Sequence, residues 1–209
     1  MKNTYSRTDE SRLNRDLPIT ISEVVIPRLP KIIYYIGIGT CFLVTGILLG
    51  CTPKVSTITK DQVSTLILVR HAEKETTGKN PSLTTAGKSR AQELSKLLEM
   101  EEIDVIFSSN YNRTLETAQP IATAKNMEIT LYDPSDLQTF AATLQKDFSS
   151  STKLIVGHSN TTPDLINILM KEQRLTHLSE KDYDDLFILT LLKNGQTKLL
   201  PLKYGVPKN

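Results

Sequence analysis

From residue 64 to the C-terminus, the sequence predicts an α/β domain built as a three-layer sandwich. Two observations support this prediction. Short apolar runs with the pattern of strands alternate with segments of helical periodicity, an order typical of a mostly parallel central sheet with helices on both faces. Near the C-terminus, in residues 185–205, two strand-like runs flank Asn194-Gly195, the strongest short signal of an antiparallel hairpin.

The domain opens with a strand and a helix. "STLILVRHA", at 64–72, is apolar enough for a buried strand. "LTTAGKSRAQELSKLLEM", at 83–100, follows as a helix that Thr84 or Thr85 caps. Four residues of this segment are spaced for one apolar helix face: Ala91, Leu94, Leu97 and Leu98.

The pattern then repeats. "IDVIFSS", at 103–109, is a second short strand, and "NRTLETAQPIATAKN", at 112–126, is a helix that Pro120 kinks or restarts. "MEITLY", at 127–132, is rich in residues that favour strands and is the third strand.

The last repeats complete the parallel part of the sheet. "SDLQTFAATLQKDF", at 135–148, is a helix that Ser135 or Asp136 can cap. "TKLIVGH", at 152–158, is the fourth strand, and "TTPDLINILM", at 161–170, is the helix after it.

Polar residues follow three of these strands at the point where each strand ends. The first strand ends in Arg70-His71, the second leads into Arg113, and the fourth ends in His158-Ser159-Asn160. In such sheets ligands bind beyond the carboxyl ends of the strands, so we expect these side chains to share one edge. His177 lies elsewhere, in a polar segment.

Two arginines and two histidines without a carboxylate cluster predict an anion site. Guanidinium groups present forked donors that match phosphate oxygens, and a histidine near neutral pH can act as a nucleophile. A phosphoryl group offers both an electrophilic phosphorus and oxygens to hold. Asn160, at the start of a helix, adds a donor there.

Four stretches together resemble the histidine phosphatase superfamily, in its phosphoglycerate-mutase-like branch and "RHAEK" subset. They are "LVRHAEK", "LTTAGKSRAQEL", "SSNYNRTLETA" and "VGHSNT". The resemblance covers about residues 65–205. It implies that His71 is the nucleophile that becomes phosphohistidine, that Arg70, Arg113 and His158 hold the phosphoryl oxygens, and that no metal or other cofactor is required.

The sequence departs from the family pattern in two places. Ala72-Glu73-Lys74 follows the histidine where Gly is usual, and Glu73 either orients His71 or pairs with Lys74. The carboxylic acid that protonates the leaving group commonly comes from the region after the third strand. Asp133 and Asp136 are the candidates, although Asp136 can cap its helix and Asp133 can start a turn. If neither serves, good leaving groups are favoured.

The segment before the domain predicts membrane attachment. Residues 1–31 are polar and form a cytoplasmic or n-region segment, and residues 32–50 are uncharged and long enough to cross a bilayer as a helix. Residues 51–63 form a polar tether, which leaves 64–209 as the histidine phosphatase-like catalytic domain. A buried core helix is the alternative reading of 32–50.

The end of the apolar segment resembles the lipobox of bacterial lipoproteins. "LLGC" closes on Cys51, where a signal peptidase would cut and lipid would attach, with an uncleaved anchor as the alternative. Arg28 and Lys31 precede the segment and predict that this side stays in the cytoplasm. The catalytic domain is therefore expected outside the cytoplasm, as a periplasmic or cell-surface lipoprotein held at the membrane through residues 32–51.

The composition and spacing narrow the function classes. The 209 residues carry a net charge of +2, which gives no basic field for nucleic acid. The two cysteines, Cys41 and Cys51, offer no disulfide framework to the domain, and no HxH or HExxH spacing favours a metal hydrolase.

Three functional readings remain. A phosphatase is favoured, and the absence of a large insertion predicts an open site for a phosphorylated small molecule, lipid, glycan or protein. A catalytically inactive lipoprotein that binds a phosphorylated ligand is the second. A serine esterase is disfavoured, because "GHSNT" has Thr161 where the nucleophile elbow requires Gly.

Overall fold

The computed structural model describes residues 63–147 and 149–205. The predictions for residues 1–31, for the apolar segment 32–50 and for lipidation at Cys51 fall outside these ranges, as does most of the tether at 51–63. Within the described ranges, no helix combines the length and the apolar character needed to cross a membrane.

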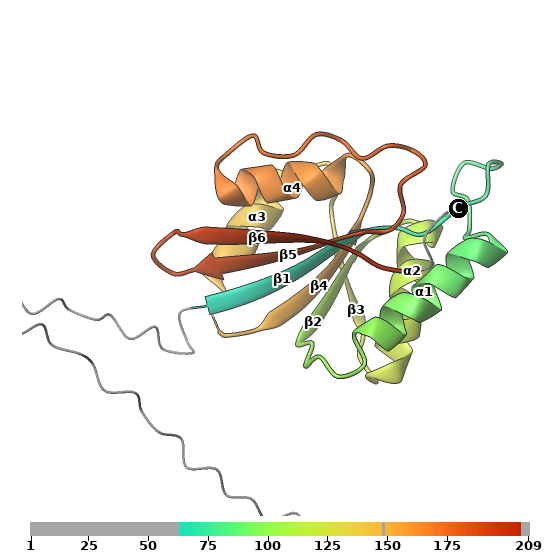
Figure 1. Cartoon of the computed structure of the whole chain (residues 1–209), viewed down its shortest axis with the longest axis horizontal. Coiled ribbons are helices and arrows are strands. Elements are labelled where there is room, and N and C mark those ends of the chain that lie inside the picture. The colour runs from blue at the N-terminus through green and yellow to red at the C-terminus, as the bar shows by residue number, and fades with distance from the viewer. Residues whose placement is uncertain (1–62, 148, 206–209) are drawn as a thin grey trace, which may run out of the picture. The chain divides into compact units, whose positions relative to one another are not determined.

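A six-stranded sheet forms the centre of the domain, in the order β3-β2-β4-β1-β5-β6 (Figure 1). The strands β3, β2, β4 and β1 are parallel, while β5 runs antiparallel to both β1 and β6. The predicted fold class is therefore confirmed, with β1 at an interior position. The strands are β1 (Val63–Arg70), β2 (Val105–Ser109), β3 (Ile129–Tyr132), β4 (Thr152–Gly157), β5 (Asp185–Leu192) and β6 (Thr197–Lys203).

Helices cover both faces of this sheet, two on each (Figure 1). One face packs against α3 (Leu137–Lys146) and α4 (Thr161–Met170), and the other packs against α1 (Thr85–Leu97) and α2 (Asn112–Ala124). The layers follow from the alternating order of elements in the sequence, because each crossover helix must return the chain to the start of the next parallel strand.

Local signals explain where the helices begin. The Thr84 side chain accepts a hydrogen bond from the Gly87 amide and caps α1, and the Asp136 carboxylate accepts one from the Thr139 amide and caps α3.

The helix α2 continues through Pro120 without a break. At the hairpin between β5 and β6, Gly195 adopts a φ of 86°, which confirms the turn predicted from Asn194-Gly195.

One core assignment was wrong. Leu94 and Leu98 are buried against the sheet, but Leu97 is 57% exposed. Leu94 and Leu98 lie four residues apart and already form the stripe that faces the sheet, so Leu97 lies beside that stripe and faces solvent.

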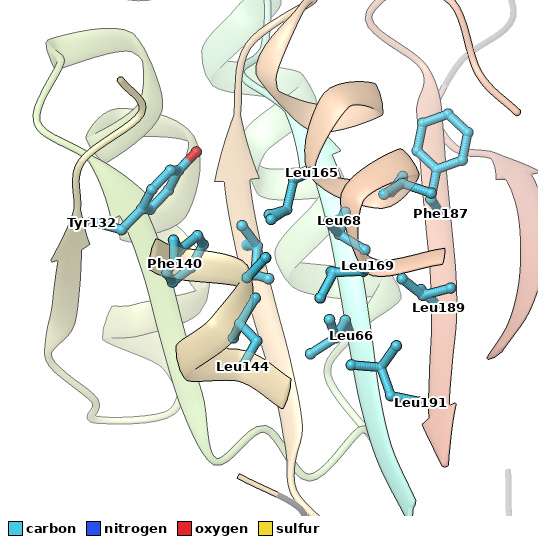
Figure 2. Packing of buried hydrophobic residues seen from close by; sticks show 13 residues of the cluster. Leu66, Leu68, Tyr132, Phe140, Leu144, Leu165, Leu169, Phe187, Leu189 and Leu191 are labelled. Carbon is cyan, nitrogen blue, oxygen red and sulfur yellow. The ribbon is translucent and has the colours of Figure 1, made fainter. Parts of the chain in front are cut away.

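Strand β1 is fixed from both sides. Leu66 and Leu68 enter one apolar cluster with residues of α3 and α4 (Figure 2), while Ile67 and Val69 enter the cluster on the opposite face. All four side chains are at most 3% exposed, and burial of each contributes about 2 kcal/mol. The residues at the end of β1 are therefore held by a rigid element.

Candidate active site

The carboxyl ends of β1, β2 and β4 open onto a cleft of about 420 Å³. The cleft contains every residue for which the sequence predicts a role in phosphoryl transfer or phosphate binding, apart from the two acid candidates. It is lined by Arg70, His71, Lys74, Tyr111, Arg113, Pro134, Ser135, His158, Ser159, Asn160, Thr161 and Glu180. Five residues predicted from the strand ends therefore lie at one edge of the sheet: Arg70, His71, Arg113, His158 and Asn160.

The hydrogen bonds of His71 fix its tautomer. Its Nδ1 lies 2.8 Å from the carbonyl oxygen of Ala72, which can only accept, so Nδ1 carries the proton. Nε2 then holds the free lone pair. The backbone amide of His71 donates to the Gly157 carbonyl at 2.9 Å and so continues the pairing of β1 with β4. An imidazole held in this way is prepared to act as a nucleophile.

His158 is held in the opposite tautomer. Arg113 Nη2 donates to His158 Nδ1 at 3.3 Å, and His158 Nε2 lies 2.9 Å from the Ser109 hydroxyl. A guanidinium can only donate, so Nδ1 is the acceptor and Nε2 carries the proton. The rings of His71 and His158 lie 5.6 Å apart at 67°.

Burial keeps both imidazoles neutral. Desolvation, with smaller effects from neighbouring positive charges, lowers the pKa of His71 from 6.5 to about 3. Desolvation, together with Arg113 and Arg70, lowers the pKa of His158 to about 4. A neutral His71 is the nucleophilic form, so His71 is ready to react at physiological pH.

We expect both histidines to remain neutral at pH 5.5, where an unperturbed imidazole is mostly protonated. In ¹⁵N NMR of histidine-labelled protein, His71 should appear as the Nδ1–H tautomer and His158 as the Nε2–H tautomer, with His71→Ala assigning the signals. Both pKa values in the folded protein lie below 6.5. The free energy of unfolding that the two neutral histidines contribute is therefore fully present above pH 6.5 and is lost as the pH falls towards 3. A His71 titration midpoint near 6.5 would contradict the geometry.

The two arginines have polar donors to spare. Arg70 is 1% exposed; its Nη1 donates to the carbonyls of Ser179 and Asp182, and its Nη2 donates to Glu180. Arg70 Nε and Arg113 Nε are buried and find no acceptor in the described part of the chain. A buried donor without a protein acceptor is typical of a site where a ligand supplies it.

The "AEK" that follows His71 has a structural explanation. Ala72 is fully buried, its carbonyl holds His71, and its amide donates to the Thr117 hydroxyl at 2.9 Å. Glu73 forms an ion pair with Arg90 of α1 at 2.9 Å, and Lys74 lines the cleft. Glu73 thus has a partner on α1 that was not among its expected contacts with His71 and Lys74.

The two acid candidates lie apart from the cleft lining. Asp136 caps α3, and Asp133 accepts hydrogen bonds from the amide and hydroxyl of Ser135 in a turn. Both carboxylates thus make the local contacts that were the alternatives to an acid role. Pro134 and Ser135, between them, do line the cleft.

Sequence reasoning missed the contribution of the segment between α4 and β5. Glu180 and Tyr183 reach Arg70 from this segment, and the Tyr183 ring centroid lies 4.2 Å from the Arg70 guanidinium carbon. Ser109, which bonds His158, was placed at a strand end but given no role. The segment has no periodicity that would locate it, so no signal in the sequence placed Glu180 at the site.

The described residues do not support the serine esterase or metal hydrolase alternatives, and the third histidine lies outside the cleft lining. His177 pairs with Asp164 at 3.1 Å, away from the cleft lining. The Ser159 hydroxyl donates to Glu180, so its hydrogen bond is not the one to histidine that a serine nucleophile needs. Across residues 63–147 and 149–205, no three His, Cys, Asp or Glu side chains gather as a metal site would require.

Comparisons with known proteins find a family match over part of the chain. Residues 66–134 match the family model of the histidine phosphatase superfamily, branch 1. Over 71 residues the chain is 46% identical to phosphoserine phosphatase 1 from Hydrogenobacter thermophilus, a match that covers 31% of this chain and 34% of that protein. The chain thus spans about a third of the length of this curated relative.

Solved structures show the same fold. The protein histidine phosphatase SixA complexed with tungstate superposes with a TM-score of 0.56 at 16% identity, over 66% of this chain and 96% of that chain. The alpha-ribazole phosphatase from Shigella flexneri gives a TM-score of 0.57 at 16% identity, over 69% and 100%. The resemblance to the histidine phosphatase superfamily is therefore confirmed over residues 66–134, and the sheet order and helical layers match the fold of these enzymes.

Proposed function

We propose that this chain, whose residues 66–134 match the histidine phosphatase superfamily, is a phosphatase that works through a covalent phosphohistidine. One observation carries the proposal: His71 presents a neutral nucleophilic nitrogen in a cleft whose two arginines keep buried donors without protein acceptors. That combination suits a group that is both electrophilic and rich in oxygen, which a phosphoryl group is.

The reaction divides into two in-line displacements. In the first, His71 Nε2 forms a bond to phosphorus as the bond from phosphorus to the leaving oxygen breaks, and the oxygen departs with the electron pair. In the second, water attacks phosphorus, the phosphorus–nitrogen bond breaks, and phosphate leaves with His71 neutral again. Arg70 and Arg113 hold the phosphoryl oxygens in both steps.

His158 supports the same oxygens once a ligand is bound. Burial and the neighbouring arginines lower its pKa. A bound phosphoryl dianion offsets those positive charges and raises the pKa, so His158 can take up a proton and donate towards the anion. This change places a positive charge where negative charge develops during transfer.

The proposal is tested by trapping the intermediate. The full-length chain in detergent is mixed with 4-nitrophenyl phosphate and quenched in alkali, where phosphohistidine survives. Mass spectrometry should find acid-labile phosphate on the peptide that contains His71. Tight binding of phosphate without any turnover or label would instead support an inactive phosphate-binding protein of the same fold.

We also propose that the domain is exported and held at the membrane through residues 32–51, with lipid on Cys51. The uncharged length of 32–50 and the "LLGC" sequence support this proposal. Substrates near a membrane would then include phosphorylated lipids, glycans or proteins of the envelope, as well as small molecules. Globomycin treatment of expressing cells should accumulate the uncut precursor, and an unchanged product that lacks lipid would rule out lipidation.

The leaving group is expected to decide the rate, because Asp133 and Asp136 make local contacts outside the cleft lining. Without a positioned acid, an aryl phosphate should react on the order of 10²-fold or more faster in kcat/KM than an alkyl phosphate. The variant Asp133→Asn should keep the activity of the wild type. Equal rates on the two esters would show that a positioned acid is present.

A further inference from the structure

The segment between α4 and β5 contributes Glu180 to the lining of the cleft. The Leu178 amide donates to the Ser159 carbonyl at 2.8 Å, which ties the segment to the turn after β4. Arg70 Nη1 donates to the carbonyls of Ser179 at 2.7 Å and Asp182 at 3.0 Å. These bonds attach the segment directly to residues that are expected to hold the phosphoryl group.

The Glu180 carboxylate bonds both Ser159 and Arg70. One oxygen accepts from the Ser159 hydroxyl at 2.8 Å, and the other lies 3.0 Å from Arg70 Nη2. The side chain is nevertheless 73% exposed. A hydrogen bond from Ser159, together with Arg70, lowers the pKa of Glu180, so the carboxylate is ionised at neutral pH. It is a poor proton donor but a fixed and accessible negative charge.

The carboxylate can stay in place when a phosphoryl group binds. A guanidinium has five N–H donors. The three bonds of Arg70 to Ser179, Asp182 and Glu180 leave two donors, on Nε and Nη2, without a protein acceptor in the described structure. These two nitrogens form the side-on fork that oxyanions accept. The phosphoryl group therefore has donors of its own beside Glu180.

The leaving group faces the mouth of the cleft. In an in-line transfer the nucleophile and the leaving oxygen lie on opposite sides of phosphorus. His71 is only 2% exposed, so a phosphoryl group that it attacks presents its leaving group towards solvent. Glu180 is the exposed carboxylate at that mouth among the residues that line the cleft.

We propose that Glu180 selects substrates whose leaving group carries an ammonium group close to the phosphate, as in phosphate esters of amino alcohols and hydroxy amino acids. This inference rests on the proposed phosphatase function and names its substrate class. Lys74, which lines the same cleft, gives a carboxylate of a hydroxy amino acid a partner of opposite charge.

The test compares two esters that differ only in charge. O-phosphoethanolamine and n-propyl phosphate have nearly the same shape, with an ammonium group in one and a methyl group in the other. In the wild type, kcat/KM should favour O-phosphoethanolamine, and Glu180→Gln should reduce that preference about fivefold, as expected for a partly exposed charge pair. Gln keeps one acceptor oxygen for Arg70, and its amide nitrogen can donate to the Ser159 hydroxyl in place of the bond that Glu180 accepts from it. Glu172→Gln removes the same charge outside the cleft lining and should leave the preference unchanged.

The result is read as a ratio, so it separates the inference from simpler roles. An unchanged ratio of kcat/KM for the two esters in Glu180→Gln overturns the inference. If both rates rise equally, Glu180 only competes with substrate for Arg70. If both rates fall equally, Glu180 only orients Arg70. If the wild type turns over neither these esters nor 4-nitrophenyl phosphate, the proposed function fails. If it turns over 4-nitrophenyl phosphate alone, calorimetric Kd values for the same pair and variants give the ratio for binding. O-phosphoserine as a third ester distinguishes a hydroxy amino acid from an amino alcohol as the source of the ammonium group.

Discussion

Replacing His71 with alanine is expected to lower kcat for 4-nitrophenyl phosphate on the order of 10⁴-fold or more. The loss is large because the variant removes the atom that bonds to phosphorus, and no weaker form of the same pathway remains. Binding should largely survive, since Arg70 and Arg113 keep their donors. His71→Ala should therefore still bind orthovanadate or inorganic phosphate, as measured by calorimetry.

Two further measurements make this expectation specific. His71→Ala should give no acid-labile phosphate after incubation with substrate. It should also unfold at a urea concentration close to that of the wild type, because the hydrogen bond from His71 Nδ1 reaches only the carbonyl of the next residue, Ala72. His177→Ala is the matched control, since His177 pairs with Asp164 outside the cleft lining. Turnover by His71→Ala within tenfold of the wild type would show that another residue is the nucleophile. His158 is then the first candidate, because its imidazole lies 5.6 Å from that of His71.

The part of the site that could be predicted from sequence is the part built at strand ends. Once strands alternate with helices, the carboxyl ends of parallel strands must meet at one edge, and whatever follows them meets as well. His71 and His158 are 87 residues apart in the chain, yet Arg70 and Gly157 are direct partners in the pairing of β1 with β4. The sequence pattern therefore predicted their proximity without any knowledge of side-chain contacts.

The contacts made by irregular segments could not be predicted in this way. Glu180 reaches Arg70 across 110 residues from a segment without helical or strand periodicity. Asp133 and Asp136 failed to reach the cleft lining for a related reason, since a short polar side chain near a helix start readily bonds the adjacent backbone. Only the three-dimensional path of the chain decides which carboxylate faces the cleft.

The pairing of Glu73 with Arg90 could also not be predicted from the sequence, because it depends on how closely α1 approaches the chain after His71. That approach is tight: a Cβ placed on Gly87 would lie 2.1 Å from the carbonyl oxygen of Glu73. The Glu73 carbonyl accepts from the amide of Thr84 at 2.9 Å, so the cap of α1 and the segment after the nucleophile are fixed together. The ion pair lies within this junction.

Glu73→Ala is therefore expected to lower the free energy of unfolding by about 3 kcal/mol, the lower end of the range for breaking a buried pair from one side. Arg90 Nε lies within 3.0 Å of both carboxylate oxygens, and Arg90 Nη2 lies 2.9 Å from one of them. The Arg90 side chain is only 8% exposed, so the variant leaves a nearly buried charge without its carboxylate. Urea denaturation measures the loss, with the exposed Glu75→Ala as the matched control.

A double variant shows whether the loss of stability arises from the unpaired charge of Arg90 or from the lost attraction between the two side chains. Replacing both partners with methionine removes the charge together with its partner and keeps most of the volume, so Glu73→Met/Arg90→Met should recover most of the stability that Glu73→Ala loses. If the double variant is instead as unstable as Glu73→Ala, the attraction itself holds α1 against the strand end. If Glu73→Ala stays within about 0.5 kcal/mol of Glu75→Ala, the pair is screened like a surface contact. In that case the close approach at Gly87 is what positions the chain after His71.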